Sequence, residues 1–102
     1  MTSDEKIRIF RRGDSSPEAI RHRLIAARKS TGLTQNDFAK EAGIIKTTYN
    51  TQEMRGAPSI KAMRHLYVQY RIDFNYLLFG DFAQLPADVQ DTLASNLTQA
   101  AE

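Results

Sequence analysis

The sequence has no cysteine, only two histidines and no long apolar run, and each of these absences excludes a class of protein. Without cysteine the chain can form neither disulfides nor thiolate metal sites. His22 and His65 lie far apart and lack a second ligand at metal-binding spacing, so we predict no metal and no cofactor. No apolar run approaches the roughly 20 residues that span a bilayer, and residues 1–6 lack a signal-peptide pattern. We expect a soluble cytoplasmic protein without a membrane partner.

Signatures of catalysis are missing as well. The chain carries no Gly-rich phosphate loop and no Ser-His-acid set with a suggestive spacing, so an enzyme is not expected. Its 102 residues, 41% of them hydrophobic, allow one domain with one modest core. The net charge is only +2, but basic residues gather in the first third and acids dominate the last third. A basic front fits attraction to phosphate, although charges that merely solubilise the protein would look the same.

The chain divides into three predicted segments: a flexible basic N-terminal arm over residues 1–14, a helical domain over 15–80 and a C-terminal helical extension over 81–102. Within the arm, Ile7, Ile9 and Phe10 alternate with basic residues and indicate a short strand.

A pair of short helices is predicted between Thr34 and Glu53. Thr34 is placed to cap the first helix, and Gly43 can adopt the positive φ that ends it and turns the chain within a few residues. A second helix begins near Lys46. It exposes four polar side chains that can address base edges or phosphates: Lys46, Thr47, Asn50 and Thr51. Such a face is also typical of an ordinary solvated helix.

Helices are predicted on both sides of this pair, which makes the fold class all-α. Ser15 or Ser16 caps a helix that begins at Pro17, and Ser59 caps another that ends around Arg71. Asp73 caps a short fifth helix, which Gly80 ends.

The segment from Leu85 to Ala100 predicts one more helix, with Val89, Leu93 and Leu97 at intervals of four. This narrow apolar stripe can pack on its own domain or on a second copy of the chain. Because five helices already complete a core by Gly80, we favour the role of a dimer contact.

The order of these elements resembles the lambda repressor-like helix-turn-helix domain of the Xre and Cro family. The resemblance covers about Glu18 to Gly80, and its motifs are Arg28 followed by TGLTQ (31–35), FAKEAG (38–43), the stretch from Tyr49 to Glu53, the helix start at Pro58-Ser59-Ile60 and NYLLFG (75–80). It implies a compact five-helix domain, which is followed here by the C-terminal helix. The third helix of such a domain enters the major groove of double-stranded DNA.

The resemblance also implies roles for single residues. Contacts to base edges fall to Lys46, Thr47, Asn50 and Thr51. Contacts to phosphate fall to Gln35, Thr48 and Arg55. Arg28 and Glu53 match a pair that the family uses as an internal salt bridge. Two positions depart from the family: Ile45 stands where Ser or Thr normally caps the third helix, and Gln52 stands where an apolar residue is usual.

The leading hypothesis is a sequence-specific DNA-binding transcriptional regulator, a repressor that acts as a homodimer on a two-fold operator. The alternative is an antitoxin or protein-interaction module that binds a partner protein through its C-terminal segment.

Overall fold

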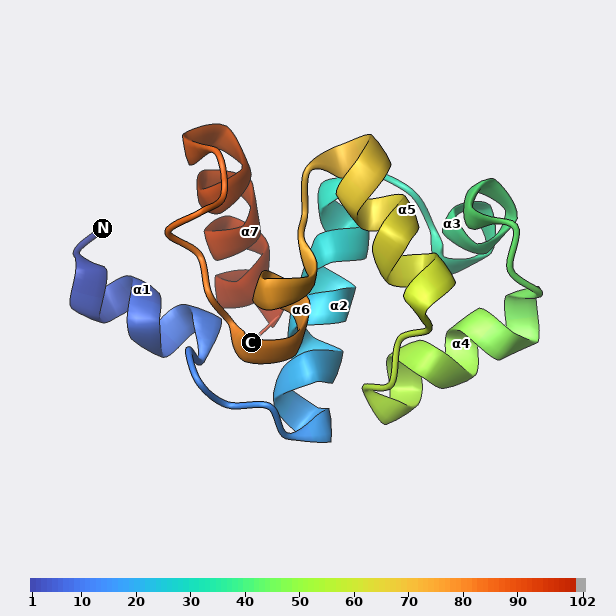
Figure 1. Cartoon of the computed structure of the whole chain (residues 1–102), viewed down its shortest axis with the longest axis horizontal. Helices are drawn as coiled ribbons and strands as arrows, with labels where there is room; N and C mark the ends of the chain where they lie inside the picture. Colours follow the sequence, from blue (N-terminus) through green and yellow to red (C-terminus); the bar gives the residue numbers. More distant parts are fainter. Residues whose placement is uncertain (101–102) are drawn as a thin grey trace.

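The computed structural model describes residues 1–100 and is helical throughout, without strands over that range (Figure 1). Its helices are α1 (Ser3–Phe10), α2 (Pro17–Ser30), α3 (Gln35–Ala42), α4 (Lys46–Arg55), α5 (Ile60–Tyr70), α6 (Phe74–Phe79) and α7 (Ala87–Ala100). The all-α prediction is therefore confirmed. None of the helices in this range has the length and apolar character needed to cross a membrane.

Five of the helices begin at a residue whose side chain accepts a hydrogen bond from the backbone amide three residues further on. These N-caps are Thr2, Ser16, Thr34, Ser59 and Asp73, with donor–acceptor distances of 2.9–3.2 Å. Each bond satisfies one of the amides that a first helical turn leaves unpaired. The helix starts thus follow from short polar residues at defined points of the sequence.

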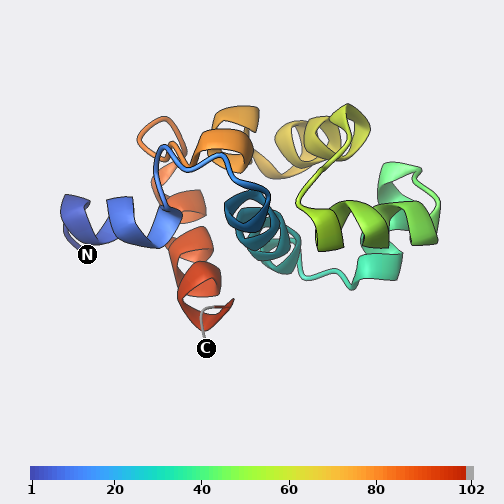
Figure 2. The ribbon, with the colours of Figure 1, turned by 90° about the horizontal axis from the view of Figure 1, so that it is seen from below.

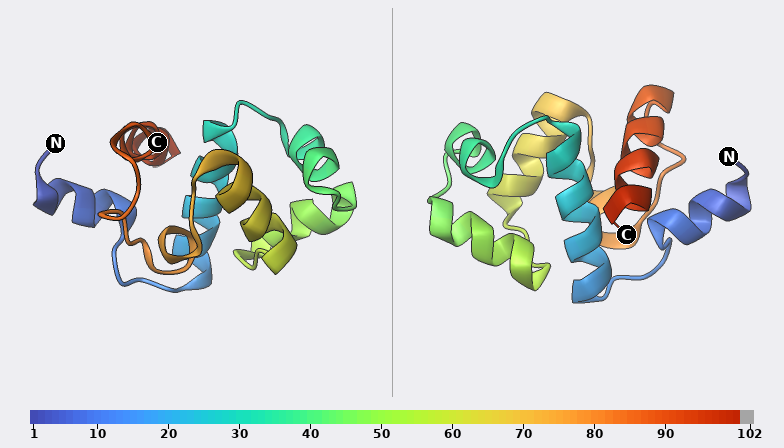
Figure 3. Two further views of the ribbon diagram at one scale, coloured as in Figure 1. Left: turned by 45° about the horizontal axis from the view of Figure 1, so that its top comes forward. Right: turned by 180° about the vertical axis from the view of Figure 1, so that it is seen from behind.

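Helix α2 lies at the centre of the fold. It packs against α4, α6 and α7, and α4 and α7 lie on opposite sides of it (Figures 2 and 3). Leu24 and Ala27 of α2 belong to the same buried cluster as Phe38 of α3, Tyr49 of α4 and Leu66 of α5. Helices α3 and α4 form one end of the elongated molecule, and α1 lies at the other end (Figure 1).

The predicted flexible arm is wrong, and so is the strand suggested within it: residues 3–10 form α1. Lys6, Ile9 and Phe10 stand at i, i+3 and i+4, and all three side chains are at least partly buried. Phe10 is fully buried, with its ring centroid 5.8 Å from that of Tyr76 and 5.0 Å from that of Phe82. So short an alternating pattern is compatible with a strand and also with one turn of an amphipathic helix. Packing against the rest of the protein decides between strand and helix.

The α7 stripe packs on its own domain, so the predicted dimer contact is wrong for these side chains. Val89, Leu93 and Leu97 are only 7%, 0% and 4% exposed within the single chain and join its main core. Asn96, on the same helix, donates from Nδ2 to Ser30 Oγ of α2 at 2.9 Å. The reason is that α2 has apolar or small residues on more than one side, and α7 covers a side that the α2–α6 helices leave open.

Arg23 joins the added N-terminal helix to the rest of the protein. This side chain is 0% exposed and donates hydrogen bonds to five backbone carbonyl oxygens. The acceptors are those of Phe10, Arg11, Asp14, Leu77 and Leu78. A buried guanidinium needs such a full set of acceptors to offset its lost hydration. It therefore ties the end of α1 and the following loop to the end of α6.

Candidate nucleic-acid interface

The turn between α3 and α4 is held from three sides. Gly43 ends α3 with φ of +73°, a conformation that glycine adopts without steric cost. Lys61 of α5 donates from Nζ to the Gly43 carbonyl oxygen at 2.8 Å. Ile44 packs against the core, whereas Ile45, the next residue, points into solvent. The start of α4 is consequently fixed relative to α3 and α5.

Helix α4 has one buried side and one exposed side. Tyr49 and Glu53 are 0% and 2% exposed, and the Tyr49 ring lies 4.9 Å from that of Phe38 in α3. The residues predicted to contact bases, together with Thr48 and Arg55, are accessible to different extents. Lys46, Thr47, Thr48 and Arg55 are exposed, and Asn50 and Thr51 are half-buried. Thr47 and Thr51 lie on one flank of α4 together with Thr48 and Arg55, and Lys46 and Asn50 are not part of that flank.

Thr51 is already held by a hydrogen bond within the helix, and Asn50 has a buried polar atom. Thr51 donates from Oγ1 to the Thr47 carbonyl oxygen at 3.0 Å. The methyl group is therefore the part of this side chain that remains available for contacts outside the helix. The Oδ1 atom of Asn50 is buried and has no hydrogen-bond partner within residues 1–100. A bidentate contact to adenine uses both the oxygen and the nitrogen of an amide, so Asn50 has to rotate before it can make one.

The predicted salt bridge between Arg28 and Glu53 is present and bidentate. Arg28 donates from Nε to Glu53 Oε2 at 2.9 Å and from Nη2 to Oε1 at 3.2 Å, and it also donates to the Leu33 carbonyl oxygen at 3.1 Å. Burial opposes ionisation of Glu53, but hydrogen bonds from Arg28 and Gln35 outweigh it and keep the pKa of this carboxyl below its usual value. The pair fastens the buried side of α4 to α2.

Gln35 takes part in the same network. Its Nε2 donates to Glu53 Oε1 at 2.9 Å, and the residue is half-buried at the first position of α3. An amide nitrogen carries two hydrogens. One of them is used inside the protein, and the other can donate to a further acceptor near the N-terminus of α3, where backbone amides favour anions.

The two residues that depart from the family pattern have different surroundings. Gln52 is half-buried, and its Oε1 accepts a hydrogen bond from the backbone amide of Ser59 at 2.9 Å. It thereby links α4 to the first turn of α5, a bond that an apolar residue could not make. Ile45 provides no side-chain cap for α4. An apolar N-cap leaves the first amides of a helix without an intramolecular acceptor.

A shallow hollow of about 430 Å³ runs along one flank of α4. Its walls are Thr47, Thr48, Thr51, Gln52, Arg55 and Ala57. Hydroxyl, amide and guanidinium donors face it, and no acidic side chain contributes to its walls. With the Arg55 guanidinium in its wall and no carboxylate, the hollow suits phosphate oxygens better than a cation.

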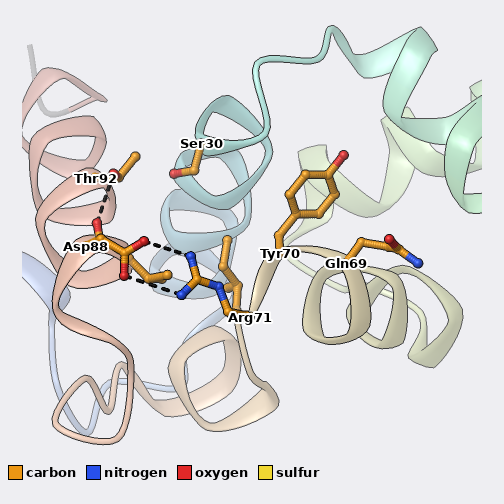
Figure 4. Close-up of a pocket in the computed structure, with 8 residues that line it drawn as sticks. Ser30, Gln69, Tyr70, Arg71, Asp88 and Thr92 are labelled. Atoms are coloured by element: carbon orange, nitrogen blue, oxygen red, sulfur yellow. Dashed lines mark hydrogen bonds and ion pairs between the residues drawn. The ribbon is translucent and has the colours of Figure 1, made fainter.

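A second, smaller pocket of about 220 Å³ lies among α2, α5 and α7 (Figure 4). Its main feature is the ion pair between Arg71 and Asp88, 2.7 Å apart. Its hydroxyl groups are all engaged in hydrogen bonds: Ser30 donates to the Ala26 carbonyl oxygen, Thr92 to the Asp88 carbonyl oxygen and Tyr70 to Glu41. The pocket therefore presents no nucleophile activated by a neighbouring base.

The two histidines have separate surroundings. His65 lies 2.7 Å from Glu41 through Nε2, and its ring packs edge-on against Phe38. Burial lowers the pKa of His22, and the nearby Arg11 lowers it further. Within the part of the chain that the structure describes, no three acidic or histidine side chains gather in a way that could hold a metal ion.

Sequence reasoning missed Arg23 and Lys61 as positioning residues. Arg23 falls at i+3 from Ile20 and one residue before Leu24, on the inner line of α2, and a charged residue at such a position signals a buried hydrogen-bonding role. Lys61 offers no comparable signal, since an exposed lysine on the first turn of a helix is ordinary.

Comparison of the chain with models of protein families, with curated proteins and with solved structures found no match.

Proposed function

We propose that the protein binds double-stranded DNA in a sequence-specific manner, with α2–α6 acting as a lambda repressor-like domain and α4 entering the major groove. The observation that carries this proposal is the two-sidedness of α4. One side is anchored by Tyr49 and by the ion pair of Glu53, and the other presents polar side chains that the fold does not need. An α-helix fits the major groove, and its N-terminal residues contact base edges.

The individual contacts follow from side-chain chemistry. Lys46 can donate to O6 or N7 of guanine, and Asn50, once rotated outward, can pair with N6 and N7 of adenine. The methyl groups of Thr47 and Thr51 can meet thymine. Contacts of this kind each contribute roughly 1–3 kcal/mol of discrimination when they are bidentate.

Phosphate contacts would set the register of α4 on the duplex. Gln35 approaches the backbone from the start of α3, and Thr48 and Arg55 approach it from the hollow beside α4. These contacts raise affinity for all sequences alike. Loss of a phosphate contact should therefore weaken binding to cognate and to random DNA equally.

Regulation of transcription, by occlusion of a promoter, is the biological role that we infer from this activity. One small domain makes few base contacts, so two copies on a two-fold site with half-sites about 34–36 Å apart would supply operator-level selectivity. Because Val89, Leu93 and Leu97 are buried, contact between copies would use other side chains. We do not advance the alternative of a partner protein bound through α7, whose apolar side is already covered.

The proposal is tested by selecting bound sequences from a random duplex pool at two salt concentrations. We expect an enriched site, with affinity that falls as salt rises. Lys46→Ala and Asn50→Ala should weaken binding to that site and relax base preference, whereas Gln35→Ala should weaken all binding. Arg8→Ala, which removes an exposed charge from α1 at the opposite end of the molecule, is the matched control. An unenriched pool, or equal losses for all four variants, would contradict the proposal.

A further inference from the structure

Ile45 has an unusual place for an aliphatic residue. Its side chain is 74% exposed, the highest value among the large hydrophobic residues of the described chain. It is the N-cap of α4 and directly precedes Lys46. Its neighbour Ile44 packs against the core, so the two isoleucines divide their roles, one inside and one outside.

The fold gives no reason for an isoleucine at this position. Ser, Thr, Asp or Asn at an N-cap accepts a hydrogen bond from the first turn, as in α1, α2, α3, α5 and α6, whereas isoleucine cannot. The helix thus loses a cap, and an apolar side chain remains in water without intramolecular packing. Both effects are unfavourable for the isolated protein. A benefit to binding would account for them.

We propose that Ile45 packs against the C5-methyl group of a thymine in the major groove and so helps to set sequence preference. This inference rests on the proposed function. The thymine methyl is the apolar group that an unmodified base pair presents in that groove. Ile45 stands at the tip of the helix that would enter the groove, where the N-terminal residues reach base edges. An isoleucine there can neither donate to phosphate nor accept from an amide, and an apolar contact is the interaction left to it.

The position also defines the neighbourhood of the contact. Lys46 is adjacent in sequence and lies on the first turn of α4. We expect the thymine next to, or one step from, the base that Lys46 contacts. A 5-methylcytosine carries the same methyl group and should satisfy Ile45 equally well.

The test replaces each thymine of the selected site, one at a time, with deoxyuridine, which removes only the methyl group. Wild-type protein should lose roughly fourfold in affinity at one position of each half-site, the effect of one methyl group withdrawn from an apolar contact. Ile45→Ser should bind the original site more weakly and become insensitive to uracil at that position. Ile60→Ser alters another exposed isoleucine, on α5, and should retain the sensitivity.

Thermal unfolding supplies an independent readout. Ile45→Ser restores a capping side chain and should raise the melting temperature while it weakens binding. The inference is overturned, and the proposed function left intact, if Ile45→Ser keeps the sensitivity to uracil. The same holds if the wild-type protein shows no sensitivity to uracil while Lys46→Ala still weakens binding to the selected site. Failure of the wild-type protein to select any DNA would instead overturn the proposed function, and this inference with it.

Discussion

Substituting Arg28 with methionine should destabilise the protein more than substituting Glu53 with glutamine, because water reaches the two partners to different extents. The Arg28 side chain is 13% exposed and that of Glu53 is 2% exposed. Arg28→Met leaves a buried carboxylate with only Gln35 as donor and also removes the bond to the Leu33 carbonyl. Glu53→Gln leaves a guanidinium that can still reach solvent and an amide oxygen that can still accept from it.

The expected magnitudes follow from that difference. Removing one partner of a buried ion pair costs about 3–5 kcal/mol of unfolding free energy. We expect Arg28→Met near the upper end of this range and Glu53→Gln at about 2–3 kcal/mol, since the charge left behind is the more hydrated one. The double variant leaves no isolated charge. It should therefore be more stable than the sum of the single effects predicts, by about 1.5–3 kcal/mol.

Urea unfolding followed by far-ultraviolet circular dichroism measures all four proteins, and the absence of tryptophan makes helical signal the natural probe. The control is the same cycle on Arg71 and Asp88, which are 2.7 Å apart but 60% and 68% exposed, where we expect no measurable coupling. Additive effects at Arg28 and Glu53 would refute the claim that burial makes this pair interdependent.

Three further changes test other parts of the structure. Leu93→Ala should cost about 2–5 kcal/mol, with a urea midpoint independent of protein concentration, because Leu93 is buried within its own chain; a concentration-dependent midpoint would restore the dimer prediction. Gly56→Ala should lower the melting temperature far more than Gly32→Ala, since both have positive φ but only at Gly56 would the added Cβ lie 1.9 Å from a backbone oxygen, that of Pro17. The pKa of Glu53 is lower in the folded state than its ordinary value of 4.5. Its stabilisation is therefore present above that pH and lost as the pH falls through the folded-state pKa. The melting-temperature gap between wild type and Glu53→Gln should accordingly narrow below about pH 4.5 and stay constant above it.

Most helix boundaries could be predicted from the sequence because capping acts over a few residues. Ser16, Thr34, Ser59 and Asp73 each cap a helix where they were expected to, and Gly43 ends α3 in the left-handed conformation. The predicted bond between Arg28 and Glu53 came from a family motif and is present as well. Local chemistry and motif spacing together were sufficient for these features.

Other features depended on packing partners far along the chain. The intervals of Val89, Leu93 and Leu97 indicate an apolar stripe, but periodicity does not say what covers it, and here α2 does. The helix over residues 3–10 is stabilised by Phe10, which packs against Tyr76 and Phe82.

The sequence by itself determined the all-α class of the domain and where its central helices start. The tertiary structure alone decided that residues 3–10 form α1 and that α7 packs against the core of its own chain. It also decided that Gln35 and Gln52 form hydrogen bonds with partners inside the protein. The physical reason is range. A cap or a turn is settled by neighbours within one helical turn, whereas the partner of an apolar face or a buried amide is chosen among all the surfaces that folding brings together.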